Sequence, residues 1–192
     1  MFFFGFYFDD PKVDRLFDLA RVVLEPQFAR KSHVTLRGPY KKKPDSSSRW
    51  LSENVGTVVI SKPRNFFSEN QNTVFLRTEI MGIGDYWYKP DYPEGVPHLS
   101  LYDGKDRKFA WQILEVLRAY PWGFSLPTTD LKIIDSKQLV ETHFLRNFDR
   151  FEASLSEIEA QKYSMEDLKG MPIGQRVFLF DRICTRIHEI TG

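Results

Sequence analysis

The chain opens with a run of large apolar side chains at residues 1–8, most of them phenylalanine. Asp9 and Asp10 end the run, which is far shorter than the roughly 20 apolar residues that a bilayer-spanning helix needs. It also lacks the basic residues that are typical of a secretion signal. We therefore expect a buried β-strand, which a second layer of structure must cover.

A helix is expected directly after this strand. Asp9 or Asp10 can cap its N-terminus, and Pro11 suits its first position. Apolar side chains then recur every three or four residues up to Leu24, and Pro26 ends the pattern. This spacing predicts an amphipathic helix that lies on a sheet.

The rest of the chain alternates between strand and helix patterns. Apolar spacing predicts a helix at residues 106–119 and two more helices after about residue 149. In the last helix, apolar residues from Ile173 to Ile190 are spaced for one buried stripe. Runs rich in β-branched and aromatic residues predict strands at residues 32–36, 56–61, 73–80, 98–101, 129–134 and 138–145.

The order of these patterns indicates an α+β plan. A chain of 192 residues has room for one compact unit with a sizeable core. We expect the main domain to cover residues 1–148. Residues 149–192 are expected to form a C-terminal helical extension that packs on the same domain.

Charge and cysteine content exclude several classes of protein. The chain has 27 Lys and Arg against 26 Asp and Glu, so no overall field attracts nucleic acid or a membrane surface. Its one cysteine, Cys184, can form neither an internal disulfide nor a thiolate metal site. No histidine or carboxylate spacing indicates a metal, and no Gly-rich loop indicates a nucleoside triphosphate. We expect a cytoplasmic protein that binds no metal, cofactor or membrane.

Two of the four histidines stand in nearly identical strings. The first string reads His-Val-Thr-Leu from His33, and the second reads His-Leu-Ser-Leu from His98. Alternate side chains of a strand face the same side, so His33 lies beside Thr35 and His98 lies beside Ser100. One such string arises easily by chance, whereas two that each begin an extended run are much rarer.

These side chains are the groups that phosphodiester cleavage needs. A base must take a proton from the attacking oxygen, an acid must protonate the leaving oxygen, and donors must hold the phosphoryl oxygens. An imidazole with a pKa near 6.5 suits both proton transfers, so we expect one ring to be neutral and the other protonated. His33 and His98 are then the base and acid in an undecided order, with Thr35 and Ser100 holding the phosphate. The alternative to catalysis is that His33 and His98 are two strand histidines whose hydrogen bonds are satisfied by their neighbours.

At these motifs the chain resembles the 2H phosphoesterase superfamily, which is named for two His-x-Thr/Ser motifs and includes RNA 2′,3′-cyclic phosphodiesterases and 2′-5′ RNA ligases. Pro97 with the second motif resembles the plant-type cyclic phosphodiesterases, and Leu-Val-Glu-Thr at residues 139–142 falls where those have their last strand. The resemblance covers about residues 2–148. It implies a two-lobed fold with antiparallel sheets flanking a central cleft, metal-free catalysis, and a phosphate linked to a ribose 2′ oxygen.

Four more side chains are candidates for substrate binding. By alternation, Arg37 and Tyr102 follow the motifs on the same face, where Arg37 could hold a phosphate and Tyr102 could stack on a base. A surface ion pair is the competing interpretation for Arg37. For Tyr102 the competing interpretation is an amphipathic tyrosine at the end of a strand. Tyr40 and Trp87 complete the set, and Trp87 belongs to an aromatic loop that either stacks on bases or seals the core.

Together these residues predict an enzyme that hydrolyses a cyclic or 2′-linked nucleotide phosphodiester without a metal. The substrate could be a 2′,3′-cyclic phosphate, a 2′-5′ oligonucleotide or a cyclic oligonucleotide second messenger, and low net charge favours a small nucleotide or short RNA. A non-catalytic module that sequesters RNA or a nucleotide is the alternative. We expect a monomer, with the C-terminal helices as a candidate partner surface.

Overall fold

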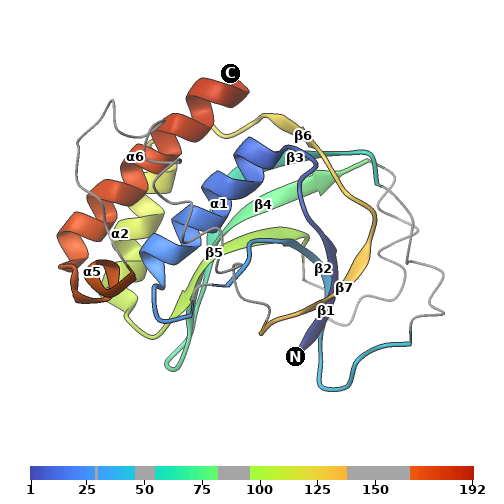
Figure 1. Cartoon of the computed structure of the whole chain (residues 1–192), viewed down its shortest axis with the longest axis horizontal. Coiled ribbons are helices and arrows are strands. Elements are labelled where there is room, and N and C mark those ends of the chain that lie inside the picture. The colour runs from blue at the N-terminus through green and yellow to red at the C-terminus, as the bar shows by residue number, and fades with distance from the viewer. Residues whose placement is uncertain (29, 46–54, 82–95, 138–164) are drawn as a thin grey trace.

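The computed structural model describes residues 1–28, 30–45, 55–81, 96–137 and 165–192. They form an α+β fold in which seven strands make one curled antiparallel sheet, with helices packed on one of its faces (Figure 1). The α+β class predicted from the sequence is confirmed. The strand predicted at residues 138–145 lies outside the described residues.

The strands run in the order β6-β3-β4-β5-β2-β1-β7 across the sheet. The strands predicted at residues 56–61 and 73–80 are present as two long paired strands. The first continues beyond its expected end, because a register shift before Pro63 accommodates this proline. The strand bounds are β1 (Phe2–Phe6), β2 (Val34–Tyr40), β3 (Thr57–Phe67), β4 (Asn72–Ile80), β5 (His98–Gly104), β6 (Ser125–Pro127) and β7 (Lys132–Asp135).

The sheet curls because its two edge strands are consecutive in the chain. Residues 128–131 alone connect β6 to β7, and this link spans at most about 18 Å. Seven strands laid flat place their edges about 29 Å apart. Phe8 forms an antiparallel bridge with Thr128, and the N–H of Asp9 donates to the carbonyl of Pro127 at 2.9 Å. The link between the edge strands is thereby fastened to the end of the first strand.

Two groups of strands meet at the motif strands. The strands β6, β3, β4 and β5 form one group, β2, β1 and β7 form the other, and the pairing of β2 with β5 joins them. That pairing consists of Val34 with Leu99 and Thr35 with His98. The family resemblance implied separate sheets beside a cleft, whereas the described strands of both groups share one continuous sheet.

The first two helices begin within one residue of their predicted positions, as α1 (Pro11–Leu24) and α2 (Arg107–Arg118). The side chain of Asp10 accepts from the N–H groups of the first turn of α1, and Asp106 does the same for α2. Apolar residues of both helices and of one sheet face form a single hydrophobic core. Burial of this apolar surface is the main favourable contribution to folding.

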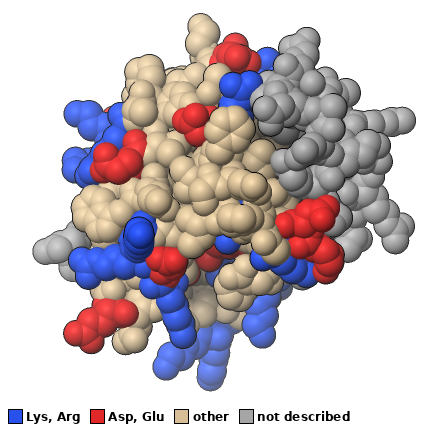
Figure 2. Space-filling model, turned by 90° about the vertical axis from the view of Figure 1, so that its left-hand side faces the viewer, with Lys and Arg blue, Asp and Glu red and all other residues tan. Residues whose placement is uncertain are grey.

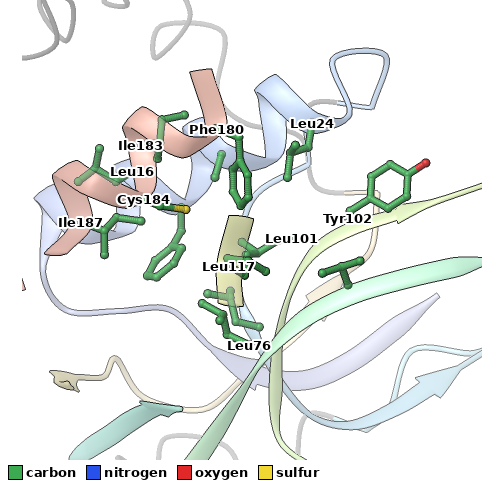
Figure 3. Close-up of a cluster of buried hydrophobic side chains, with 14 of the residues drawn as sticks. Leu16, Leu24, Leu76, Leu101, Tyr102, Leu117, Phe180, Ile183, Cys184 and Ile187 are labelled. Atoms are coloured by element: carbon green, nitrogen blue, oxygen red, sulfur yellow. The ribbon is translucent and has the colours of Figure 1, made fainter. Parts of the chain in front are cut away.

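The C-terminal residues add α5 (Met165–Gly170) and α6 (Ile173–Thr191). The stripe expected in α6 is buried only in its middle, because this helix of 19 residues is longer than the 14-residue α1 on which it packs. Ile173 and Ile190 at its ends are exposed. The buried side chains of α6 join the common core (Figure 3) and are Phe180, Ile183, Cys184 and Ile187.

A single arginine fastens α6 to the end of α1. The guanidinium of Arg176 donates to the carbonyl oxygen of Val23 at 2.9 Å and also to that of Leu24. These carbonyls have no partner within α1, so the arginine satisfies groups that a helix C-terminus leaves open. The face of Arg176 also lies over the ring of Phe109 in α2, at 4.7 Å from its centroid. The three helices are thus tied together at one point.

Figure 2 shows the left-hand side of the view in Figure 1, which is formed largely by helices. Charged side chains of both signs surround an uncharged area in the middle of this side (Figure 2). In the part of the chain that the structure describes, no helix is long and apolar enough to cross a membrane.

Candidate active site

The two histidine motifs lie side by side on neighbouring strands. Thr35 of β2 pairs directly with His98 of β5, and Val34 pairs with Leu99. The same antiparallel register places His33 opposite Ser100, since the residue numbers of each pair have the same sum. Each imidazole therefore has one motif hydroxyl beside it along its own strand and another across the strand pair.

The four polar motif side chains lie on the sheet face that points away from the helices. The apolar residues that alternate with them all belong to the hydrophobic core and are Val34, Leu36, Leu99 and Leu101. Alternation over the two motifs is thus as expected from the sequence. The packing of the apolar residues holds the polar ones on rigid elements, which suits groups that must act together.

The same type of hydrogen bond holds each imidazole. Nδ1 of His33 lies 3.2 Å from the carbonyl oxygen of Lys31, and Nδ1 of His98 lies 2.7 Å from that of Val96. A carbonyl oxygen only accepts, so Nδ1 carries the proton and Nε2 of each neutral ring is an acceptor. Among the described residues, neither the Nε2 atoms nor the two motif hydroxyls have a hydrogen-bond partner.

The environment of both imidazoles favours their neutral form. Burial lowers the pKa of His33 to about 4, and the nearby guanidinium of Arg21 contributes to the decrease. Burial also lowers the pKa of His98, although the Val96 carbonyl and Asp103 act in the opposite direction. The expectation of one protonated ring at neutral pH assumed the pKa of an exposed imidazole, and burial shifts both rings toward the neutral form.

A partly buried ion-pair network lies next to the first histidine. The carboxylate of Asp18 accepts from the N–H of Ser32 at 2.6 Å and from Nζ of Lys31 at 3.2 Å, and Lys31 also pairs with Asp14 at 2.7 Å. Burial raises the pKa of Asp18 to about 6. Because the carbonyl of Lys31 binds the ring of His33, Asp18 holds the segment that orients this imidazole.

Phenylalanine rings contact both imidazoles. Phe75 pairs with Ser100 across β4 and β5, and its ring centroid lies 5.0 Å from that of His98. The ring of Phe3 lies 5.9 Å from that of His33. These rings exclude water from one side of each imidazole, in agreement with the lowered pKa values.

Tyr102 does not share the face of the two imidazoles. A register shift after Ser100 leaves Leu101 as an extra residue in β5, which is a β-bulge. The bulge turns Tyr102 into the core (Figure 3), and its hydroxyl accepts from the N–H of Asp106 at 3.1 Å. Its ring lies so close to Gly104 that a Cβ at this position would clash with it. The predicted stacking of Tyr102 on a substrate base is therefore wrong.

A similar irregularity separates Arg37 from the first motif. Gly5 of β1 pairs with Thr35, but its neighbour Phe4 pairs with Arg37, which leaves Leu36 without a matching residue. Alternation therefore stops between the motif and Arg37. The strand geometry does not support the predicted contact of this arginine with a phosphate at the motif face.

Of the remaining two substrate-binding candidates, Tyr40 is not brought to the imidazoles. Tyr40 lies about 16 Å along β2 from Thr35, where it pairs with Phe2 and packs its ring against Phe4 at 5.7 Å between centroids. Trp87 lies outside the described residues. Sequence reasoning also missed Asp18 and Phe75, because a helix aspartate and a strand phenylalanine carry no local signal of a site.

Within the described residues, no group of His, Cys, Asp or Glu side chains could hold a metal ion. Comparison of the chain with protein-family models, curated proteins and solved structures finds no match.

Proposed function

We propose that this protein is a metal-independent phosphodiesterase that hydrolyses a cyclic or 2′-linked nucleotide phosphodiester, in the manner of the 2H phosphoesterases. The observation that carries the proposal is the direct pairing of Thr35 with His98, which brings two imidazoles and two hydroxyls onto one sheet face. Diagonal neighbours on paired strands lie about 7–8 Å apart, which leaves room for a phosphate between His33 and His98.

The environments of the two rings favour different roles. His33 has a pKa of about 4, so it is neutral and its Nε2 can take a proton from the attacking hydroxyl or water. Asp103 favours the protonated form of His98, and the negative charge of a bound phosphodiester acts in the same direction. His98 is therefore the acid that protonates the leaving oxygen, while Thr35 and Ser100 donate to the non-bridging oxygens.

Three substrate types fit this chemistry: a 2′,3′-cyclic phosphate, a 2′-5′ oligonucleotide and a cyclic oligonucleotide. In the first, water forms a bond to phosphorus and one ribose oxygen leaves with a proton from His98. In the others, either water or a neighbouring ribose hydroxyl attacks. In every case the base gains the proton that the nucleophile loses, so the two histidines exchange protonation states in one turnover.

The test is turnover of these three substrate types in the presence of EDTA, followed by chromatography of the products. We expect hydrolysis of at least one type by the wild-type chain, and its loss in His33→Ala. Retention of the wild-type circular dichroism spectrum and melting temperature by the variant excludes unfolding as the cause. Tight nucleotide binding without any turnover supports the sequestering module instead, and a requirement for added metal contradicts the mechanism.

A further inference from the structure

One exposed aromatic side chain lies on the same sheet face as the motifs. Phe66 of β3 is 51% exposed and lies near the end of this strand, where β3 pairs with β4 and β6 no longer borders it. Its ring stacks on that of Phe75, with centroids 4.6 Å apart and an interplanar angle of 24°. Phe75 is 1% exposed and lies against His98, and the ring of Phe66 is itself 6.2 Å from His98.

This arrangement gives Phe66 a fixed orientation. A ring that stacks on a buried ring has one face covered, and its exposure leaves the other side open to a ligand. The rigid support lowers the entropy that the side chain loses on binding a flat partner. Phe66 is therefore a preformed aromatic surface next to a proposed catalytic residue.

Two arginines accompany this surface. Arg64 pairs with Phe75 from the neighbouring strand, and Arg77 pairs with His98. Both side chains are exposed, and directly paired residues share a sheet face. An open aromatic ring beside guanidinium groups is the combination with which proteins bind nucleotides, because bases stack on the ring and phosphates attract the cations.

We propose that Phe66 is the stacking surface for the nucleobase of the substrate, adjacent to the phosphate position between the two histidines. This inference rests on the proposed function and assigns a binding contact to the base next to the scissile phosphate. Stacking tolerates every base and strengthens with the size of the ring system, so a purine is preferred over a pyrimidine. The competing explanation is that Phe66 and Phe75 only stabilise the β3–β4 hairpin as a cross-strand pair.

The experiment compares Phe66→Leu and Phe66→Trp with the matched control Phe178→Leu. Phe178 is 50% exposed on α6, so its replacement removes an equally exposed ring from the helical side. The probes are adenosine 2′-monophosphate, cytidine 2′-monophosphate and 1-O-methylribose 2-phosphate, which has no base. Isothermal titration calorimetry at pH 5.5 gives the affinity of each protein for each probe.

We expect the wild-type chain to bind the adenosine probe more tightly than the cytidine probe and the probe without a base most weakly. Phe66→Leu lowers affinity for the adenosine probe at least about 5-fold and leaves the probe without a base unchanged. Phe66→Trp keeps the preference, and Phe178→Leu binds like the wild type. Equal loss for all three probes, an unchanged adenosine affinity in Phe66→Leu, or no binding of any probe by the wild type overturns the proposal.

This readout separates the two proposals because binding needs no turnover. Base-dependent binding that is lost in Phe66→Leu, in a protein that cleaves nothing, supports the stacking surface and rejects the phosphodiesterase. Cleavage of cyclic phosphates with and without a base at equal kcat/KM, unaffected by Phe66→Leu, supports the phosphodiesterase and rejects the stacking surface.

Discussion

Thr35 of β2 lies directly opposite His98 of β5, so each histidine motif borders the other across a pair of antiparallel strands. This contact belongs to the short pairing that joins the two groups of strands into one sheet. The same strand pairing that completes the fold thus sets the separation of the two imidazoles.

The lowered pKa values predict an acidic pH optimum. A neutral His33 is needed as the base, so kcat/KM rises with pH through a pKa of about 4. A protonated His98 is needed as the acid, and its lowered pKa moves the decrease of kcat/KM to a lower pH than an exposed imidazole would give. A pH profile of kcat/KM in EDTA checks this bell shape. A rate that keeps rising above pH 7 contradicts the assigned roles.

Replacement of His33 by asparagine should make the fold less sensitive to acid. In the unfolded chain His33 titrates near pH 6.5, whereas burial lowers its pKa to about 4 in the folded chain. The unfolded state therefore takes up the proton first, and the stability contribution is full above pH 6.5 and lost as pH falls to 4. Urea unfolding should show that the wild type loses about 3 kcal/mol relative to His33→Asn between pH 7 and pH 4. Equal pH dependence of both proteins would show that His33 is exposed.

Asp18 is expected to act as a positioning residue for His33. Asp18→Ala leaves the buried N–H of Ser32 without its acceptor, which costs about 1–3 kcal/mol of stability. The released segment also lets water reach His33, so NMR titration should show that the pKa of this imidazole rises and kcat falls. Asp18→Asn keeps an acceptor oxygen and should restore most of the lost stability and most of the lost kcat. Lost stability with an unchanged His33 pKa would mean a purely structural role.

Loss of Arg176 should destabilise the whole domain. Arg176→Met removes the hydrogen bonds to the carbonyls of Val23 and Leu24, at a cost of about 2 kcal/mol. The control is Arg186→Met, since Arg186 forms a surface pair with Glu189 that contributes less than about 1 kcal/mol. Urea unfolding followed by both circular dichroism and tryptophan fluorescence should give one transition. Separate transitions for the two probes would show that α6 folds independently.

Local patterns in the sequence were sufficient to predict most of the helices and strands. Asp10 and Pro11 mark the start of α1 because capping and proline geometry act within one turn. The polar and apolar residues of each motif alternate as the pleat of a strand demands. These signals depend on neighbours in the chain, so no knowledge of the tertiary structure was needed.

Features that depend on distant residues were not predictable in the same way. One inserted residue at a bulge reverses the alternation of everything after it, and both Arg37 and Tyr102 follow such a bulge. The stacking of Phe66 on Phe75 arises from the register of the β3–β4 hairpin. The lowered pKa of His33 results from burial, which a motif alone does not reveal.

The most direct test of the two-histidine site is the kcat/KM of His33→Ala, His98→Ala and the double variant in EDTA, with the cyclic nucleotide that the wild type cleaves fastest. Each single variant should lose about 10²- to 10⁴-fold, because a base or an acid is missing. The double variant should be no slower than the slower single variant, since the two rings act as one unit. Variants that retain the wild-type rate, or losses that simply multiply in the double variant, would contradict catalysis by this pair.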